Sequence, residues 1–148
     1  MNGFTRDEIE GREILKDVLK GKCTIEFTTH PYDSVDAYST GKTISVIEIK
    51  NRDISENTYP DVMLEMTKFM ALQKAMLTHP TEKALYITIF RENIYAWDIA
   101  KTKVEDLKWK WEPCTKNTAE NYGETIVWKL VTFLKKENAL WKKPRTKK

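Results

Sequence analysis

The chain has 148 residues, the length of one domain, which is enough to bury a core without disulfides or a structural metal. Hydrophobic residues make up 41% and aromatic residues 11%, which excludes a chain that is disordered throughout. The formal net charge of +3 is too small to indicate nucleic-acid binding by itself. The two cysteines form no CxxC pair, and no apolar run approaches the roughly 20 residues that a membrane span needs. We therefore expect a single cytoplasmic domain over residues 1–148 without a membrane partner.

The first expected element is a helix. Thr5 and Glu8 are spaced as a capping box, in which each side chain bonds to the other residue's backbone N–H. An apolar stripe at helical spacing follows, and Gly21 stands just past its last residue. The pattern predicts a helix over 6–20.

Three strands are expected next. Alternation and β-forming residues predict a strand over 23–29. Two more apolar segments, 35–39 and 43–50, flank Gly41, which can supply the turn between them. These two segments are therefore predicted to form an antiparallel hairpin.

A second helix and two more strands follow. Residues 53–60 are polar and favour a loop, after which Asp61 is placed to cap a helix that Pro80 would end. The near-continuous apolar run 84–90 is typical of a strand buried on both faces. Residues 93–99 alternate, as a partner strand would.

The C-terminal region is less regular. A short strand is expected within 108–112, and β-branched residues favour a strand over a helix for 124–134. The basic segment 142–148 is expected to be a flexible tail, with a phosphate-binding role as the alternative. Trp109 and Trp111 either cover a sheet edge or stack on unpaired bases. The three remaining tryptophans are expected to pack inside the fold: Trp97, Trp128 and Trp141.

Three ionisable residues belong to the predicted hairpin. Glu48 and Lys50 are two positions apart on one strand and therefore project to the same face. Asp36 lies on the partner strand, where antiparallel pairing can bring it close to Glu48. The sequence thus places two carboxylates and an ammonium group together at the end of a strand.

This pattern of Asp36 followed by Glu48-Ile49-Lys50, within an α-β-β-β-α-β order over residues 6–90, resembles the PD-(D/E)XK nuclease superfamily. Val35 stands where the proline of the family's motif would be. The resemblance implies an α/β (α+β) fold with a restriction-endonuclease-like αβββαβ core, in which helices flank a mixed central sheet. Its small members include phage nucleases, junction resolvases and repair enzymes.

The resemblance also implies a chemistry. The carboxylates of Asp36 and Glu48 and the carbonyl of Ile49 would hold Mg²⁺ or Mn²⁺, a hard cation that prefers oxygen ligands. Lys50 would orient the metal-activated water that hydrolyses a DNA phosphodiester bond. Asp33 is a rival to Asp36, because a tighter turn would put it opposite Glu48. The expected function is a metal-dependent deoxyribonuclease, with a non-catalytic nucleic-acid-binding module on the same fold as the alternative.

Further residues complete the expected site. Glu10 lies on the apolar stripe of the first helix and is a candidate metal ligand, unless it reaches solvent. Lys68 either contacts the phosphate, as related nucleases imply, or forms a surface ion pair with Glu65 three residues away. Because one small domain has a short DNA footprint, a homo-oligomer is expected. The basic tail offers further candidate contacts to nucleic acid: Lys142, Lys143 and Arg145.

Overall fold

The computed structural model describes residues 4–30, 33, 35–41, 43–79, 81–102, 104–115 and 126–145. The helices are α1 (Arg6–Leu19) and α2 (Met66–Thr78), with short 3-10 turns at Ile99–Lys101, Val104–Asp106 and Lys136–Asn138. The strands are β1 (Thr24–Phe27), β2 (Ala37–Thr40), β3 (Ser45–Asn51), β4 (Asp61–Glu65), β5 (Lys83–Ile89), β6 (Asn93–Asp98), β7 (Lys110–Thr115), β8 (Ile126–Lys135) and β9 (Trp141–Pro144).

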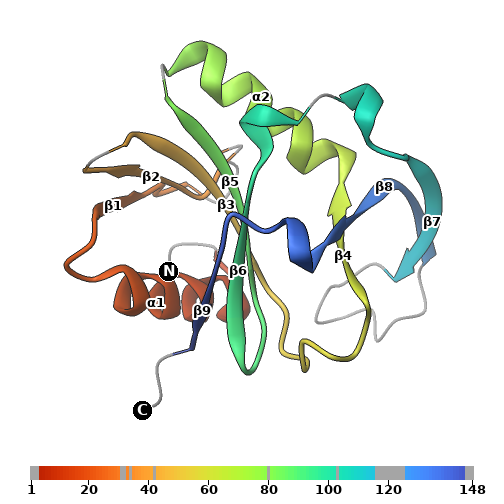
Figure 1. Cartoon of the computed structure of the whole chain (residues 1–148), viewed down its shortest axis with the longest axis horizontal. Helices are drawn as coiled ribbons and strands as arrows, with labels where there is room; N and C mark the ends of the chain where they lie inside the picture. The colour runs from red at the N-terminus through yellow and green to blue at the C-terminus, as the bar shows by residue number, and fades with distance from the viewer. Residues whose placement is uncertain are drawn as a thin grey trace.

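A six-stranded mixed sheet forms the centre of the molecule (Figure 1). Its order is β1-β2-β3-β5-β6-β9, and its central pair β3–β5 is parallel while the other pairs are antiparallel. Strand β5 is buried almost throughout, as expected for a central strand that is covered on both faces. The predicted α/β architecture with its αβββαβ core is confirmed, and the antiparallel β2–β3 hairpin pairs as expected.

Helix α1 covers one face of this sheet. Thr5 caps the helix, and its side chain and that of Glu8 form the reciprocal bonds of the predicted capping box. The helix ends at Leu19, and Gly21 follows with φ of 81°, a conformation that glycine adopts without strain. The apolar residues under α1 include Leu15, Ile47 and others of one buried cluster.

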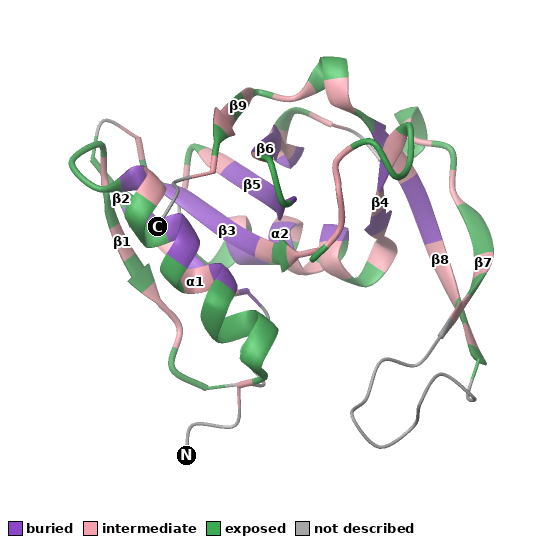
Figure 2. Ribbon diagram, turned by 90° about the horizontal axis from the view of Figure 1, so that it is seen from below, coloured by how far each residue is buried: buried purple, intermediate pink, exposed green. Residues whose placement is uncertain are grey.

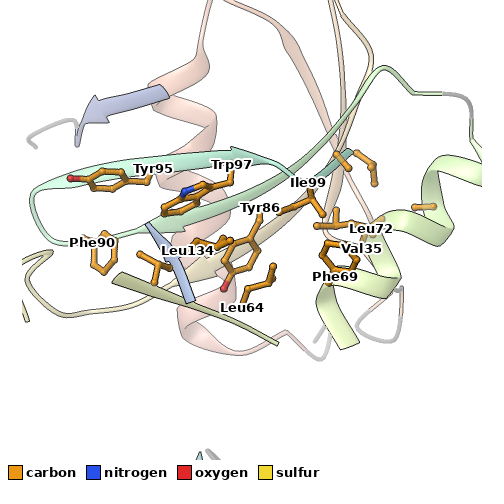
Figure 3. Packing of buried hydrophobic residues seen from close by; sticks show 14 residues of the cluster. Val35, Leu64, Phe69, Leu72, Tyr86, Phe90, Tyr95, Trp97, Ile99 and Leu134 are labelled. Atoms are coloured by element: carbon orange, nitrogen blue, oxygen red, sulfur yellow. The ribbon is translucent and has the colours of Figure 1, made fainter. Parts of the chain in front are cut away.

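The opposite face is covered by α2 together with a second, three-stranded antiparallel sheet of order β4-β8-β7. Figure 3 shows the aromatic and aliphatic side chains of this core, including Tyr86, Trp97 and Phe69. Buried residues accordingly lie on both faces of β3 and β5 (Figure 2). Among the described residues, no helix combines the length and the apolar character that crossing a bilayer requires.

Two segments differ from the sequence expectations. Asp61 does not cap a helix: Asp61–Glu65 is strand β4, whose Val62 and Leu64 are buried against β8, and α2 begins only at Met66. Residues 142–144, expected in the flexible tail, belong to β9 and pair with β6. Residues 146–148 lie outside the described part of the chain.

The tryptophans divide between core and surface. Trp97 is buried as expected, and Trp109 packs edge-on against Phe69. The expectation for Trp128 was wrong, since 64% of this residue is exposed on the β7–β8 pair, together with Trp111 at 63%. The second sheet therefore has an open aromatic face.

Candidate active site

A cleft of about 920 Å³ opens between the N-terminal turns of α1 and strand β8. These two elements lie on opposite sides of β3 in Figure 2. Asp36, Glu48 and Lys50, which were predicted to lie together, are at the floor of the cleft. The second sheet contributes Val127 and Lys129 to the far wall. The cleft is thus lined both by the central sheet with its helices and by β8 of the second sheet.

The register of the β2–β3 hairpin puts the two floor carboxylates together. Ala37 pairs with Ile47, so the next residues outward, Asp36 and Glu48, face each other where β2 begins. Burial and the neighbouring charge of Asp36 raise the pKa of Glu48 from 4.5 to about 8, although Lys68 opposes the shift. Two acids this close disfavour double ionisation, which is the electrostatic condition that a bound cation relieves.

Asp36 is held from two directions. Its Oδ2 accepts a hydrogen bond of 2.7 Å from the backbone N–H of Ile49, and its Oδ1 lies 3.7 Å from Nη2 of Arg12. Arg12 also donates to the carbonyl of Thr28 at 2.6 Å, and its guanidinium lies 4.1 Å from the ring centre of Phe4. Arg12 therefore ties α1 to the segment that carries Asp36 and fixes the orientation of this carboxylate.

Glu48 is 5% exposed and forms an ion pair of 3.1 Å with Lys68 on α2. Burial acts to lower the pKa of Lys68, but the carboxylate of Glu48 outweighs it and raises this pKa. The alternative ion pair between Lys68 and Glu65 does not form. Glu65 instead pairs with Lys129 at 3.2 Å. Lys68 lies beside Glu48 in the lining of the cleft.

Lys50 lines the same cleft on the face of β3 that carries Glu48. Desolvation and the charge of Arg52 lower the pKa of Lys50, while Glu65 opposes the shift. A lysine with a lowered pKa loses its proton more readily than a solvated one, which suits a group that exchanges a proton with water or a leaving group.

Asp33, the rival metal ligand, also lines the cleft. Its Oδ2 accepts a hydrogen bond of 3.0 Å from the backbone N–H of His30, and its own N–H donates to the His30 carbonyl. The carboxylate is thus used to close a local turn, and Asp36 occupies the position opposite Glu48.

The other predicted site residues lie elsewhere. Glu10 is exposed and is not part of the cleft lining; its Oε1 lies 3.5 Å from Arg145 and accepts a bond of 3.4 Å from Asn51. Lys142 lies 3.7 Å from Glu56, so Lys142 and Arg145 each have an acidic partner within the chain. Lys143 lies over the ring of Trp141.

Two cleft residues were missed by reasoning from the sequence. Arg12 follows Gly11 on the helix stripe, and its spacing carries no signal that it reaches Asp36. Lys129 comes from a strand whose pairing with β4 places it next to Glu65, and only tertiary structure reveals this contact. Both cations lie beside the acids of the cleft.

The donor set at the floor fits a hard divalent cation. The described residues contain no group of three or more His, Cys, Asp or Glu side chains suited to a metal. Two adjacent carboxylates with one backbone carbonyl and water nevertheless match Mg²⁺, which commonly keeps several waters and takes one or two protein carboxylates. The lining side chains of the cleft include five Lys or Arg residues against six Asp or Glu residues. The negative charge of the lining exceeds the positive charge only when Glu48 is ionised, and a cation at the floor would offset this charge.

Comparison with known proteins gives limited information. No protein-family profile matches the sequence, and no curated protein is detectably similar to it. Among solved structures, the chain is similar to Hjc, a Holliday junction resolvase from the archaeal hyperthermophile Archaeoglobus fulgidus. The match has 15% identity and a TM-score of 0.47, and it covers 62% of this chain and 74% of that chain. A function for the chain therefore has to come from the geometry of its cleft.

Proposed function

We propose that the protein is a metal-dependent nuclease that hydrolyses phosphodiester bonds of DNA, as its resemblance to the PD-(D/E)XK superfamily implies. The observation that carries the proposal is the meeting of the Asp36 and Glu48 side chains at the floor of an open cleft, with Lys50 on the same strand face. A carboxyl group whose pKa is raised by burial and by a neighbouring acid, inside an open cleft, is typical of a functional site.

The chain's own residues divide the work. Asp36 and Glu48, with the carbonyl of Ile49, would hold Mg²⁺ or Mn²⁺, which when bound supplies positive charge to the phosphate and acidifies water. Asp36 is kept in place by the N–H of Ile49 and by Arg12. Lys50 positions the attacking water and offers a proton, and its lowered pKa favours this exchange.

Cations around the floor would bind the substrate. Lys68 and Lys129 stand on the α2 and β8 sides of the cleft, at positions where they can contact phosphate oxygens on either side of the scissile bond. Each also forms an ion pair with an acid of the cleft, Lys68 with Glu48 and Lys129 with Glu65. With Glu48 among the residues that would hold the metal, Lys68 would be available to phosphate.

A cleavage assay tests the proposal. Plasmid, linear and branched DNA are incubated with the protein in Mg²⁺ or Mn²⁺, and in parallel with EDTA. Cutting is expected only with metal, and Glu48→Gln or Lys50→Met should lower the rate by at least about 100-fold, the usual size of a general acid–base contribution. The matched controls are Glu13→Gln and Lys16→Ala, exposed residues of α1 outside the cleft lining.

DNA binding in Ca²⁺ separates the two candidate functions. Glu48→Gln and Lys50→Met should still bind DNA, and circular dichroism should show that both variants are folded. Wild-type protein that binds DNA but does not cut any of the three forms would favour the non-catalytic binding module. Variants that cut as fast as the controls would remove Glu48 and Lys50 from the site.

A further inference from the structure

A second pocket, of about 170 Å³, lies on the face of the six-stranded sheet that α1 covers. It is located at the start of β3, at Ser45, whereas Glu48 and Lys50 occupy the other end of this strand. Helix α1 stops at Leu19, which forms one side of the pocket, and Trp141 of β9 is another lining residue. The pocket is thus separate from the cleft.

The floor of this pocket is made of hydroxyl groups. Ser39 and Ser45 are directly opposite each other in the β2–β3 ladder, so their side chains point to the same face of the sheet. The two residues are only 6% and 2% exposed and line the pocket. Neither hydroxyl oxygen is among the described buried atoms that lack a partner, so these hydroxyls face the space of the pocket. The next pair along the same face is apolar, Ala37 and Ile47.

This floor is suited to a polar ligand. Each hydroxyl that faces the pocket can donate one hydrogen bond, and a ligand with acceptor oxygens can take the place of the water that solvates it. Two serines side by side therefore offer two donors to one ligand. Thr43, which also lines the pocket, adds a third hydroxyl at the turn between β2 and β3.

The charge around the pocket is positive. Lys22 and Lys83 line it, and no Asp or Glu is among the described lining residues. Lys143 on β9 is a further cation near this pocket, because the proximity of Lys22 and burial lower the pKa of Lys143. Neighbouring ammonium groups repel each other, and an anion bound between them would relieve this repulsion. This contrasts with the cleft, where acids outnumber cations.

We propose that this pocket binds a phosphate group, with the hydroxyls of Ser39 and Ser45 donating to its oxygens and Lys22 and Lys83 neutralising its charge. Trp141 lines one side, and the volume of about 170 Å³ is large enough for one phosphate group. The phosphate can come from the nucleic-acid backbone or from a small phosphate compound. The site is independent of the acid pair in the cleft, so it stands even if the chain does not cleave DNA.

The first experiment titrates inorganic phosphate into the wild-type protein while ¹H–¹⁵N spectra are recorded, with chloride at equal ionic strength as the reference. The backbone signals of Ser39, Ser45 and Lys22 should shift with saturation. Lys22→Ala and the double variant Ser39→Ala/Ser45→Ala should each weaken the apparent affinity by about tenfold or more. Lys20→Ala, an exposed neighbour outside the pocket, should leave the affinity unchanged.

The second experiment measures DNA affinity in Ca²⁺ over a range of salt concentrations. If the phosphate belongs to the nucleic-acid backbone, Lys22→Ala should reduce the slope of log affinity against log salt by about 1, and Lys20→Ala should not. A change in phosphate binding without a change in this slope assigns the pocket to a small phosphate compound. If Lys22→Ala matches Lys20→Ala in both experiments, the pocket does not bind phosphate. The serine variants remove a hydroxyl each and add no atoms, so loss of folding does not confuse the outcome.

Discussion

The carboxylate of Glu48 and the ammonium group of Lys68 lie 3.1 Å apart, although β3 and α2 present them from opposite sides of the cleft floor. The side chain of Glu48 is 6% exposed and that of Lys68 is 44% exposed. Glu48 therefore has one acidic neighbour, Asp36, and one basic neighbour, Lys68. Its pKa is raised because burial and Asp36 together outweigh the effect of Lys68. A proton and a divalent metal ion would therefore compete for the carboxyl group of Glu48.

The stability of the metal-free protein should fall as the pH rises from about 5 to 8.5. The pKa of Glu48 is about 8 in the fold against an ordinary 4.5, so the folded state retains a proton that the unfolded state loses. The resulting stabilisation is fully present below pH 4.5 and is lost as the pH passes through 8. Since one pKa unit corresponds to about 1.4 kcal/mol, the effect should be on the order of a few kcal/mol. Urea unfolding of wild type and Glu48→Gln in EDTA measures it. The variant should show a flatter pH profile, and an identical profile would mean that Glu48 is not protonated in the fold.

Divalent metal should stabilise the protein most at the alkaline end of this range. Below the pKa of Glu48, Mg²⁺ has to displace a proton, whereas above it the carboxylate is free to bind. A ligand present at 100 times its dissociation constant adds about 2.7 kcal/mol to the free energy of unfolding. Thermal unfolding with Mg²⁺ at pH 6 and pH 8.5, reversed by EDTA, tests this dependence. Asp36→Asn should abolish the metal effect, whereas Glu13→Gln should preserve it; equal stabilisation of both variants would contradict the assignment.

Arg12 should support metal binding without touching the metal. Arg12→Lys keeps the charge but cannot bond to both Thr28 and Asp36, because a lysine ammonium lacks the planar fork of a guanidinium. We expect this variant to fold, to lose about 1–2 kcal/mol of stability with the bond to the Thr28 carbonyl, and to bind Mg²⁺ several-fold more weakly. Calorimetric titration measures the Mg²⁺ affinity, and urea unfolding measures the stability. Unchanged metal affinity in a destabilised Arg12→Lys protein would make Arg12 a purely structural residue, and Lys16→Ala provides the reference.

Gly11 should be needed for the close approach of α1 to β3. A Cβ atom added at this buried position would lie 3.2 Å from the Cβ of Asn51 and 3.5 Å from a methyl group of Ile49. Alanine favours a helix over glycine by about 1 kcal/mol, but crowding in a packed core costs about 1–3 kcal/mol. Because Asn51 cannot move its Cβ without moving β3, we expect Gly11→Ala to be net destabilising. Urea unfolding measures the change, and a stabilised Gly11→Ala variant would show that the helix shifts freely.

Features that depend on neighbouring residues could be predicted from the sequence. The capping box of Thr5 and Glu8 and the glycine after α1 are local signals, and both formed as expected. Alternation and a turn at Gly41 brought Asp36 within reach of Glu48, but a tighter turn would have put Asp33 there, and the pairing of Ala37 with Ile47 decides for Asp36. The three residues at the cleft floor were thus found because a single hairpin carries them.

Features that depend on distant residues could not be predicted in this way. The apolar residues Val62, Met66 and Phe69 fit helical spacing, but the pairing of Asp61–Glu65 with β8, some 70 residues later, makes the first part of this run a strand. Glu65 and Lys68 are correctly spaced for a helical ion pair, yet Lys129 and Glu48 offer each a partner from another element. Tertiary contacts outweighed local preference at these positions.

The pairing of β8 with β4 and of β9 with β6 has a consequence for the order in which the protein matures. A growing chain that has reached Thr115 already contains the hairpin with Asp36 and Glu48, but β4 and β6 still lack the partners that residues 126–144 supply. Unpaired strand edges invite association with other chains, and pairings between distant segments form slowly. The nascent protein is thus expected to be prone to aggregation until translation has delivered both strands, and the wall of the cleft that Val127 and Lys129 form is missing until β8 is made.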